Sequence, residues 1–286
     1  MGEPAAEFDV DRALVAELLA TQHPDLADLP LRPVGSGWDN AIFRLGSELS
    51  VRLPRRSLSV PLVLHEQRWL PEIAPRLPLP IPVPVRQGVA GGGYPWPWSI
   101  TPWFAGTTAC TVARESLVAR QLGEFVKSLH FPAPRGAPRN PYRGVPLAAR
   151  DQRTRLGIDH LDESVDRESL LRAWNDALRI PEWRRPDVWV HGDLHPLNLV
   201  MQGDRLSAVI DFGDVCAGDP ATDLAVGWML FDQPARSTFK ESAGVDADTW
   251  SRGRGWAIAL GIAWQGGGEH LTQIGSRALS AVLEDS

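Results

Sequence analysis

The sequence predicts an α+β protein in two parts, a small β-rich N-terminal part and a larger, mainly helical C-terminal part. Short apolar runs separated by glycine turns lie between residues 31 and 54, whereas apolar residues at helical spacings of three and four dominate after residue 114. The 286 residues are enough for one large domain or two smaller ones. We therefore expect two domains, residues 1–105 and 106–286.

The first elements follow from local signals. Residues 9–20 carry apolar side chains at helical spacing behind Asp9 or Asp11, either of which would serve as the N-cap of a helix. Residues 31–54 contain three runs of strand character, the last two separated by a Gly-Ser-Glu turn. Three short antiparallel strands are expected there.

A second helix is expected over residues 61–70, limited by Pro71 and Pro75 because proline lacks an N–H group. Residues 71–84 contain six prolines with Leu, Ile and Val between them, which favours extended backbone. An exposed proline-rich ligand would be more polar, so we expect a buried connector. An aromatic strand that ends near Gly106 should follow.

The C-terminal part should be built on helices. The segment that begins at residue 114 and ends at His130 has the apolar spacing of a core helix. Further helical stretches and short β segments are expected at 167–179, 188–191, 197–201, 206–211, 220–232 and 249–264.

The composition excludes several classes of protein. The net charge is −6, and neither side of residue 105 has more basic than acidic residues, so nucleic acid is not an expected partner. The longest apolar run near the C-terminus, residues 256–264, is too short to cross a bilayer, so no membrane partner is expected. The N-terminus lacks the features of a secretory signal, which predicts a cytoplasmic protein. Cys110 and Cys216 are expected to be reduced.

The chemistry is concentrated in three consecutive motifs. HGDLHPLN at residues 191–198 contains Asp193 and Asn198, IDFGD at 210–214 contains Asp211, and GDPATDLA follows. Phosphoryl transfer from a nucleotide needs a carboxylate that orients the attacking hydroxyl and oxygen ligands for Mg²⁺. Two aspartates and an asparagine at this spacing supply both.

These motifs resemble those of the aminoglycoside phosphotransferase family, a branch of the protein-kinase-like fold. The resemblance implies a two-lobed small-molecule kinase with a nucleotide-binding lobe ending in a hinge near residue 105, followed by a catalytic and acceptor-binding lobe. It also implies ATP or GTP and Mg²⁺ as cofactors. On this resemblance Asp193 is the catalytic base, Asn198 and Asp211 hold Mg²⁺, and Asp219 or Asp223 braces the catalytic loop.

The N-terminal part contains the expected nucleotide contacts. Ser36 lies between two glycines in G-S-G, where these kinases have a loop over the phosphates, although Asn40 replaces the third glycine of the protein-kinase loop. Arg52 occupies the strand position at which protein kinases have lysine, and Glu66 on the next helix is its expected partner. The backbone from Ile100 to Trp103 resembles the hinge that binds the purine. Trp38, in the glycine loop, is expected to be exposed.

The histidines of HGDLHPLN also match the pattern of zinc ligands. We favour a structural interpretation for His191, as a buried ring that holds the catalytic loop through hydrogen bonds. His195 is assigned no role, although it is a candidate to face the site. A zinc hydrolase would leave the Asp193, Asn198 and Asp211 spacing unexplained.

The acceptor is predicted less directly than the reaction. The resemblance implies a hydroxyl of an aminoglycoside-like antibiotic, and hence a role in resistance. The alternatives are a kinase of a macrolide or metabolite alcohol, and a nucleotide-binding protein without transfer activity, which the Arg52 departure motivates. Residues 159–168 contain five acidic residues, and Asp159, Asp162 and Glu163 are candidates to attract a polycationic sugar. A solvated helix start explains the same run equally well.

Overall fold

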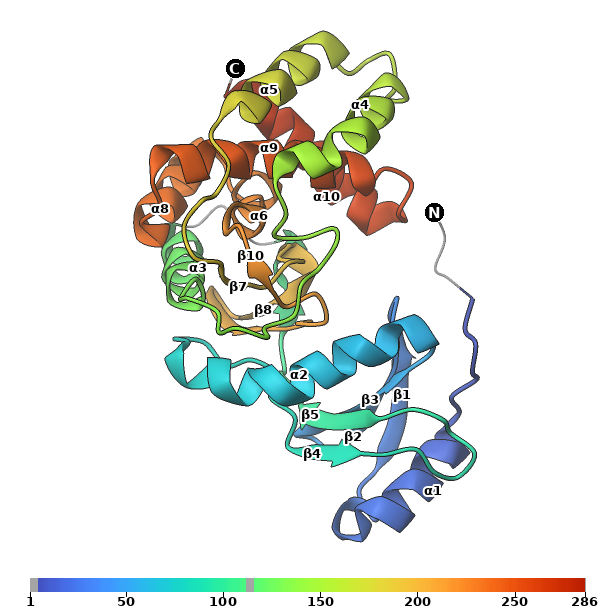
Figure 1. Cartoon of the computed structure of the whole chain (residues 1–286). Coiled ribbons are helices and arrows are strands. Elements are labelled where there is room, and N and C mark those ends of the chain that lie inside the picture. The colour runs from blue at the N-terminus through green and yellow to red at the C-terminus, as the bar shows by residue number, and fades with distance from the viewer. Residues whose placement is uncertain (1–4, 112–115, 286) are drawn as a thin grey trace. The chain divides into compact units, whose positions relative to one another are not determined.

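The computed structural model describes residues 5–111 and 116–285 and divides them into two compact units (Figure 1). One unit contains residues 5–75 and 80–105, and the other contains residues 76–79 and 106–285 within the described range. The first is built around an antiparallel sheet and the second around helices, so the predicted α+β class is correct.

The N-terminal unit is a five-stranded sheet with two helices. The strands are ordered β1-β2-β3-β5-β4, and each neighbouring pair is antiparallel. The elements are α1 (Arg12–Gln22), η1 (Pro24–Leu26), β1 (Leu31–Ser36), β2 (Asn40–Leu45), β3 (Leu49–Pro54), η2 (Ser57–Ser59), α2 (Val60–Ile73), η3 (Ala74–Arg76), β4 (Arg86–Gly88) and β5 (Trp98–Pro102).

Successive side chains of β3 point to opposite faces of this sheet, so the two faces carry different residues. Val51 and Leu53 are fully buried in the cluster that contains Val15 and Leu18 of α1. Because successive side chains of a strand point to opposite faces, Arg52 points away from that cluster, toward α2. The core and the predicted ion pair therefore use opposite faces of the same strand.

The expected helices of this unit are present with two differences. Asp11 is the N-cap of α1, and its side chain accepts a hydrogen bond from Leu14 N at 2.8 Å. The prediction that Pro71 ends the second helix is wrong, because α2 continues to Ile73. Pro71 lies on the exposed face, where solvent reaches the carbonyl that loses its partner.

The proline-rich connector is only partly as expected. Its backbone is irregular after η3, but only Ile73, Ile81 and Pro82 of residues 71–84 are buried and the others are half-buried or exposed. The prediction of a buried connector is wrong for most of the segment. Because prolines alternate with the apolar residues in this segment, few of its side chains pack together against the apolar core.

The C-terminal unit contains the remaining elements. Its two small sheets have the orders β10-β7 and β6-β8-β9. The elements are β6 (Thr107–Thr108), η4 (Ala109–Thr111), α3 (Ser116–Leu129), η5 (Leu147–Arg150), α4 (Asp151–Asp159), α5 (Arg167–Arg179), β7 (Val188–Val190), η6 (Pro196–Asn198), β8 (Leu199–Gln202), β9 (Arg205–Val209), β10 (Cys216–Gly218), α6 (Ala221–Leu224), α7 (Val226–Leu230), α8 (Gln233–Ala243), α9 (Ala247–Ala263) and α10 (Glu269–Glu284).

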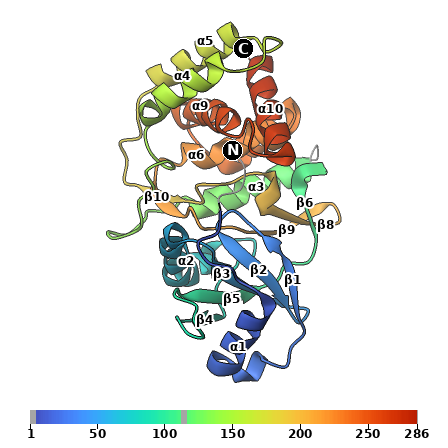
Figure 2. The ribbon, with the colours of Figure 1, turned by 90° about the vertical axis from the view of Figure 1, so that its right-hand side faces the viewer.

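Helices α4, α5, α9 and α10 pack together around a large apolar cluster that includes Trp174 and Trp256 (Figure 2). The helix expected over 220–232 is present as two short helices, with Ala225 between them still near helical geometry. Helices α4, α8 and α10 lie outside the expected segments. Of the helices in the described chain, none combines the length and hydrophobicity needed to cross a bilayer. Both cysteines are free.

The contact between α3 and α8 depends on Gly123. A Cβ atom at this position would lie 2.5 Å from Ser242 Cβ and 2.8 Å from the Phe239 carbonyl oxygen, so α3 approaches α8 closely only because glycine has no side chain.

Gly123→Ala is expected to lower the free energy of unfolding by about 1–3 kcal/mol, because overpacking outweighs the better helix propensity of alanine. Urea unfolding followed by circular dichroism measures this difference. Lys127→Ala on the same helix is the control and should change stability by less than about 0.5 kcal/mol. A stabilised Gly123→Ala variant would contradict the close approach.

Candidate active site

The loop after β7 is held by one buried carboxylate. Asp223 of α6 has no exposed surface, and its oxygens accept hydrogen bonds from His191 N at 2.8 Å and Gly192 N at 2.9 Å. His130 Nε2 lies 3.1 Å from the same carboxylate. These contacts satisfy two backbone donors that would otherwise be buried without partners, and they fix the residue that follows, Asp193.

His191 holds the loop from the opposite end. Its Nε2 donates to Ile210 O at 3.0 Å, and its Nδ1 accepts from Asp193 N at 3.2 Å. The ring packs on Phe212 with centroids 4.4 Å apart. Both ring nitrogens have backbone partners, which leaves no lone pair for a zinc ion.

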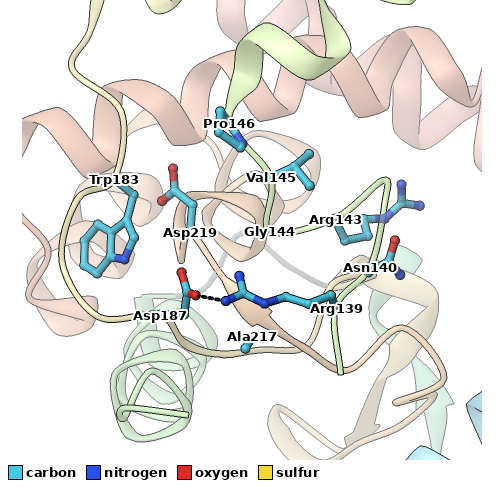
Figure 3. Close-up of a pocket in the computed structure, with 10 residues that line it drawn as sticks. All are labelled: Arg139, Asn140, Arg143, Gly144, Val145, Pro146, Trp183, Asp187, Ala217 and Asp219. Carbon is cyan, nitrogen blue, oxygen red and sulfur yellow. Dashed lines mark ion pairs between the residues drawn. The ribbon is translucent and has the colours of Figure 1, made fainter. Parts of the chain in front are cut away.

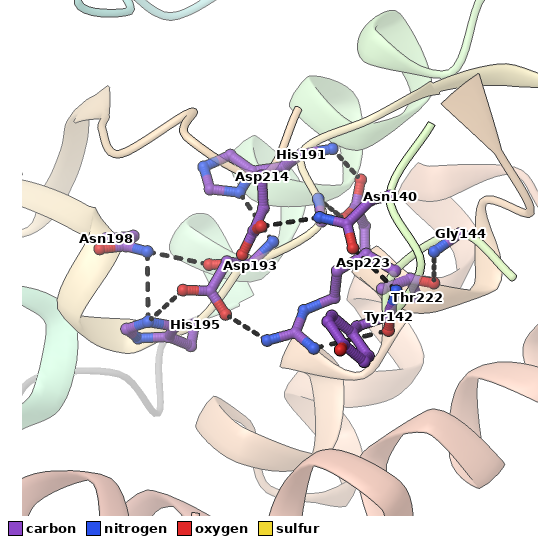
Figure 4. A network of polar contacts seen from close by, with 12 residues as sticks. Asn140, Tyr142, Gly144, His191, Asp193, His195, Asn198, Asp214, Thr222 and Asp223 are labelled. Carbon is purple, nitrogen blue, oxygen red and sulfur yellow. Dashed lines mark hydrogen bonds and ion pairs between the residues drawn. The ribbon is translucent and has the colours of Figure 1, made fainter. Parts of the chain in front are cut away.

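Asp193 lies between a cation and an imidazole (Figure 4). Oδ1 is 3.3 Å from Arg143 Nη2, and Oδ2 is 3.3 Å from His195 Nε2. His195 Nδ1 accepts from Leu197 N at 3.3 Å, and Asn198 Nδ2 lies 3.2 Å from His195 Nε2, so the ring is held between the loop backbone and Asn198. The histidine left without a role therefore contacts the candidate base.

This environment keeps Asp193 ionised. Burial raises the pKa of Asp193, but His195 and then Arg143 act in the opposite direction, and the net effect holds the pKa well below its usual range. The carboxylate is therefore charged at every physiological pH and accepts hydrogen bonds only.

Asn198 and Asp211 are brought together by the pairing of β8 with β9. Ile210 N donates to Asn198 O at 2.9 Å, one residue before Asp211. Asn198 is buried, and its Nδ2 donates to Asp193 O at 2.9 Å. Asp211 has a φ of 64°, the only positive φ among non-glycine residues of the described chain. Such backbone strain is typical of functional sites.

Asp214 adds a third carboxylate to this region. Burial raises the pKa of Asp214, and the charges of Asp193 and Asp211 raise it further, against the effect of Arg143. Gly192 allows this approach, because a Cβ atom there would lie 2.5 Å from Asp214 O, and its φ is 85°. The two loops meet through backbone contact.

The oxygen-rich donor set fits Mg²⁺ better than zinc. Within the described residues, no three His, Cys, Asp or Glu side chains form a metal-binding group. Mg²⁺ needs only one or two protein oxygens, since waters and substrate phosphates complete its octahedron. Asp211 and Asn198 supply a carboxylate and an amide oxygen, and the three mutually repelling carboxylates of this region would favour a cation.

Two residues of the loop before η5 join the network without any sequence signal. Asn140 Nδ2 donates to Asp214 Oδ1 at 2.7 Å, and Arg143 contacts Asp193. Both also line a cavity of about 300 Å³ with Trp183, Asp187 and Asp219 (Figure 3). These two residues lie in a loop without periodicity or a motif, so nothing in the sequence indicated their role.

The predicted ion pair of the N-terminal unit is present. Arg52 Nη1 lies 2.9 Å from Glu66 Oε1, and the two side chains are 10% and 3% exposed. The pair joins β3 to α2, as the lysine and glutamate pair does in protein kinases.

A family model decides the assignment. The model described as the phosphotransferase enzyme family matches residues 30–256. The chain belongs to this family. The match extends over the ion pair, the Asp193 loop and the Asp211 loop.

Several solved structures have a fold similar to that of this phosphotransferase. The GDP complex of aminoglycoside 2'-phosphotransferase-IIIa is similar with a TM-score of 0.73 at 18% identity, covering 96% of this chain and 99% of that chain. Macrolide 2'-phosphotransferase MphH from Brachybacterium faecium gives 0.65 at 21% identity, with 95% and 98% covered. A search of curated proteins found no match. The predicted family and protein-kinase-like fold are confirmed.

Of the two aspartates predicted as alternatives to brace the catalytic loop, Asp219 is not the one that contacts it. Its carboxylate accepts from Arg252 Nε at 2.7 Å and Nη2 at 3.2 Å, and from Ala221 N at 3.0 Å. Asp219 therefore joins α6 to α9, whereas Asp223 contacts the Asp193 loop. Sequence spacing does not separate two aspartates of one motif.

Two backbone groups of the predicted hinge already have partners within the N-terminal unit. Ile100 is fully buried in β5 and its carbonyl accepts from Val85 N at 2.8 Å, while Trp103 N donates to Glu48 O at 2.7 Å. Purine binding by the other backbone groups from Ile100 to Trp103 stays a prediction.

The glycine loop is fixed by arginines at the end of β3. Arg55 donates to Gly37 O at 3.2 Å, and Arg56 donates to Trp38 O at 3.2 Å. Trp38 is 46% exposed, as predicted. The side chain of Ser36 lies outside the described residues, so its role stays a prediction.

The acidic run has a local explanation. Asp159 ends α4, Asp162 accepts from Ser164 N at 2.9 Å, and Asp166 is the N-cap of α5. These carboxylates, with the exposed Glu163, serve a turn and a helix start, as the alternative interpretation holds. Their binding of an acceptor stays a prediction.

Asp223→Ala is expected to lower the free energy of unfolding by about 2–5 kcal/mol, because it leaves the N–H groups of His191 and Gly192 buried without acceptors. Chemical denaturation measures the loss. Asp232→Ala, which removes only the N-cap of α8, is the matched control and should cost about 1 kcal/mol. Equal losses would contradict the anchoring role.

Proposed function

We propose that this phosphotransferase transfers the γ-phosphoryl group of a nucleoside triphosphate to a hydroxyl group of a small molecule. One observation carries the proposal: Asp193 is held ionised on a loop tied to Asp223, and Asn198 and Asp211 are joined to that loop through neighbouring hydrogen bonds. This is the arrangement that phosphoryl transfer requires.

In this proposal Asp193 orients the acceptor. Its carboxylate accepts the hydrogen bond of the acceptor hydroxyl, whose oxygen attacks the γ-phosphorus as the bond to the leaving nucleoside diphosphate breaks. The hydroxyl proton passes to Asp193. Because the low pKa makes Asp193 a weak base, its contribution is mainly placement, in line with the loose transition state of phosphoryl transfer.

Mg²⁺ and the nucleotide complete the proposal. Asp211 and Asn198 would hold Mg²⁺, which neutralises phosphate charge when bound. Arg52 keeps its positive charge even when buried, and a guanidinium matches the geometry of a phosphate group. Similar structures were solved with GDP and ADP, which supports a purine nucleotide, ATP or GTP, as donor.

Two classes of acceptor are candidates. An aminoglycoside-like antibiotic is the first, because similar structures include a complex of streptomycin, ATP and APH(2")-IIa. Another small alcohol is the second, since a macrolide phosphotransferase has the same fold and a cation, Arg143, contacts Asp193 in this chain. A non-transferring protein is disfavoured because the base and both metal ligands are intact.

Asp193→Asn is expected to lower kcat by about 10²–10⁴-fold while nucleotide affinity stays within about twofold, because the amide cannot take the hydroxyl proton. The measurement is a mass-spectrometric screen for phosphoryl gain on aminoglycosides, macrolides and metabolite alcohols with ATP or GTP and Mg²⁺.

Asp204→Asn, in the exposed turn between β8 and β9, is the matched control and should retain full activity. Unchanged turnover in Asp193→Asn would refute the assignment of the base.

Asp211→Asn is expected to weaken Mg²⁺-dependent nucleotide binding by about tenfold or more, since a charged oxygen ligand becomes neutral. Calorimetric titration of nucleotide with and without Mg²⁺ measures the effect. The difference between the two titrations should shrink in the variant, and an unchanged Mg²⁺ dependence would exclude Asp211 as a ligand.

A further inference from the structure

Arg150, at the end of η5, is a buried cation without a counterion. The residue is 6% exposed, and its Nε is buried without a hydrogen-bond partner. Among the described residues, none forms an ion pair or hydrogen bond with this guanidinium. The ring of Tyr142 lies 5.8 Å from the guanidinium carbon. An unpaired buried charge is costly, so a protein keeps one only where something compensates it.

The neighbours of Arg150 make this cost larger. Burial lowers the pKa of Arg150, and the positive charges of Arg143 and Arg153 lower it further. The adjacent Asp151 is used elsewhere, since its Oδ1 accepts from Arg155 Nε and Trp174 Nε1, each at 2.7 Å. Arg143 and Arg150 are therefore close enough for their charges to interact, and no carboxylate of the described chain pairs with Arg150.

This group of arginines adjoins the candidate catalytic residue. Arg143 lies 3.3 Å from Asp193 Oδ1, and its own Nε is buried without a partner. The loop that carries it is fixed, because Tyr142 N donates to Asn140 Oδ1 at 2.8 Å (Figure 4). Tyr142 is 57% exposed and lies beside both arginines. Tyr142 and Arg143, neighbours in the sequence, thus connect Arg150 to Asp193, since the Tyr142 ring faces Arg150 and Arg143 contacts Asp193.

An anion is the ligand that this chemistry recognises. A guanidinium offers paired donors that match a carboxylate or phosphate, and burial strengthens the attraction. A polycation would meet repulsion from these two arginines. The exposed Tyr142 ring offers an apolar face to the carbon skeleton of a ligand.

We propose that Arg150, with Arg143, binds a carboxylate or phosphate group of the acceptor whose hydroxyl is presented to Asp193. This inference rests on the proposed function and narrows its substrate class. The acceptor is then a hydroxyl compound that carries an anionic group, and a polycationic aminoglycoside does not fit.

The binding test uses inorganic phosphate as the probe, at constant ionic strength, with the wild-type chain and Arg150→Met. The variant is expected to bind phosphate at least tenfold more weakly, and to melt at the same or a higher temperature without phosphate, because the buried charge is gone. Arg150→Lys should be intermediate, since it keeps the charge and loses the paired donors.

Arg179→Met is the matched control, because this arginine is exposed and pairs with Asp176 on the surface of α5. It should bind phosphate as the wild type does. Equal phosphate affinity in wild type, Arg150→Met and Arg150→Lys would overturn the site, and so would a loss in Arg179→Met equal to that in Arg150→Met.

The acceptor test uses four compounds with one carbon skeleton and different charge: gluconate, glucose 6-phosphate, glucose and glucosamine. Each competes with phosphate for the wild-type chain. Gluconate and glucose 6-phosphate should compete at least tenfold better than glucose or glucosamine, and Arg150→Met should remove the difference. Preference between the two anions distinguishes a carboxylate from a phosphate. Equal competition by all four would overturn the inference.

The two proposals fail in different ways. Phosphate binding through Arg150 without transfer to any hydroxyl would leave the anion site standing and refute the proposed function. Transfer that depends on Asp193, with KM values that Arg150→Met leaves unchanged for anionic acceptors, would support the proposed function and refute the anion site. Asp193→Asn should retain phosphate binding in either case.

Discussion

The site depends on the buried carboxylate of Asp223. It accepts from two consecutive backbone N–H groups, His191 N and Gly192 N, and contacts His130 Nε2. A buried carboxylate is tolerated only with such partners, and the loop keeps its conformation only with such an acceptor. Because the Asp223 carboxylate of α6 needs donors and the loop after β7 needs an acceptor, the two fix each other, and Asp193 is held in place next to them.

The charges around Asp193 separate into two groups. Asp211 and Asp214 lie on the side of the β8–β9 hairpin, and their repulsion is seen in the raised pKa of Asp214. Arg143 and Arg150 come from the loop and helix start that precede α4. Asp193 contacts the second group directly through Arg143. This division supports the proposal of a metal and phosphate side and an acceptor side within one unit.

The N-terminal unit shows how one departure from the kinase pattern is accommodated. Arg52 replaces the usual lysine, yet it lies 2.9 Å from Glu66 in a nearly buried pair. Burial would push a lysine toward its neutral form, whereas arginine stays charged. The strand therefore delivers a permanent cation with a fixed partner, which supports the proposed contact with nucleotide.

The sequence alone determined the features that depend on local pattern: the strands β1 to β3, the helices α3 and α5, and the order of Asp193, Asn198 and Asp211. Periodicity, capping and motif spacing act over a few residues and are written in the chain. Only the tertiary structure decided which aspartate of GDPATDLA holds the catalytic loop, that the Ile100 carbonyl is used inside the sheet, and that Arg143 and Arg150 adjoin Asp193. These outcomes depend on partners far apart in sequence, and neither periodicity nor motif spacing encodes which distant groups satisfy a buried charge or backbone donor.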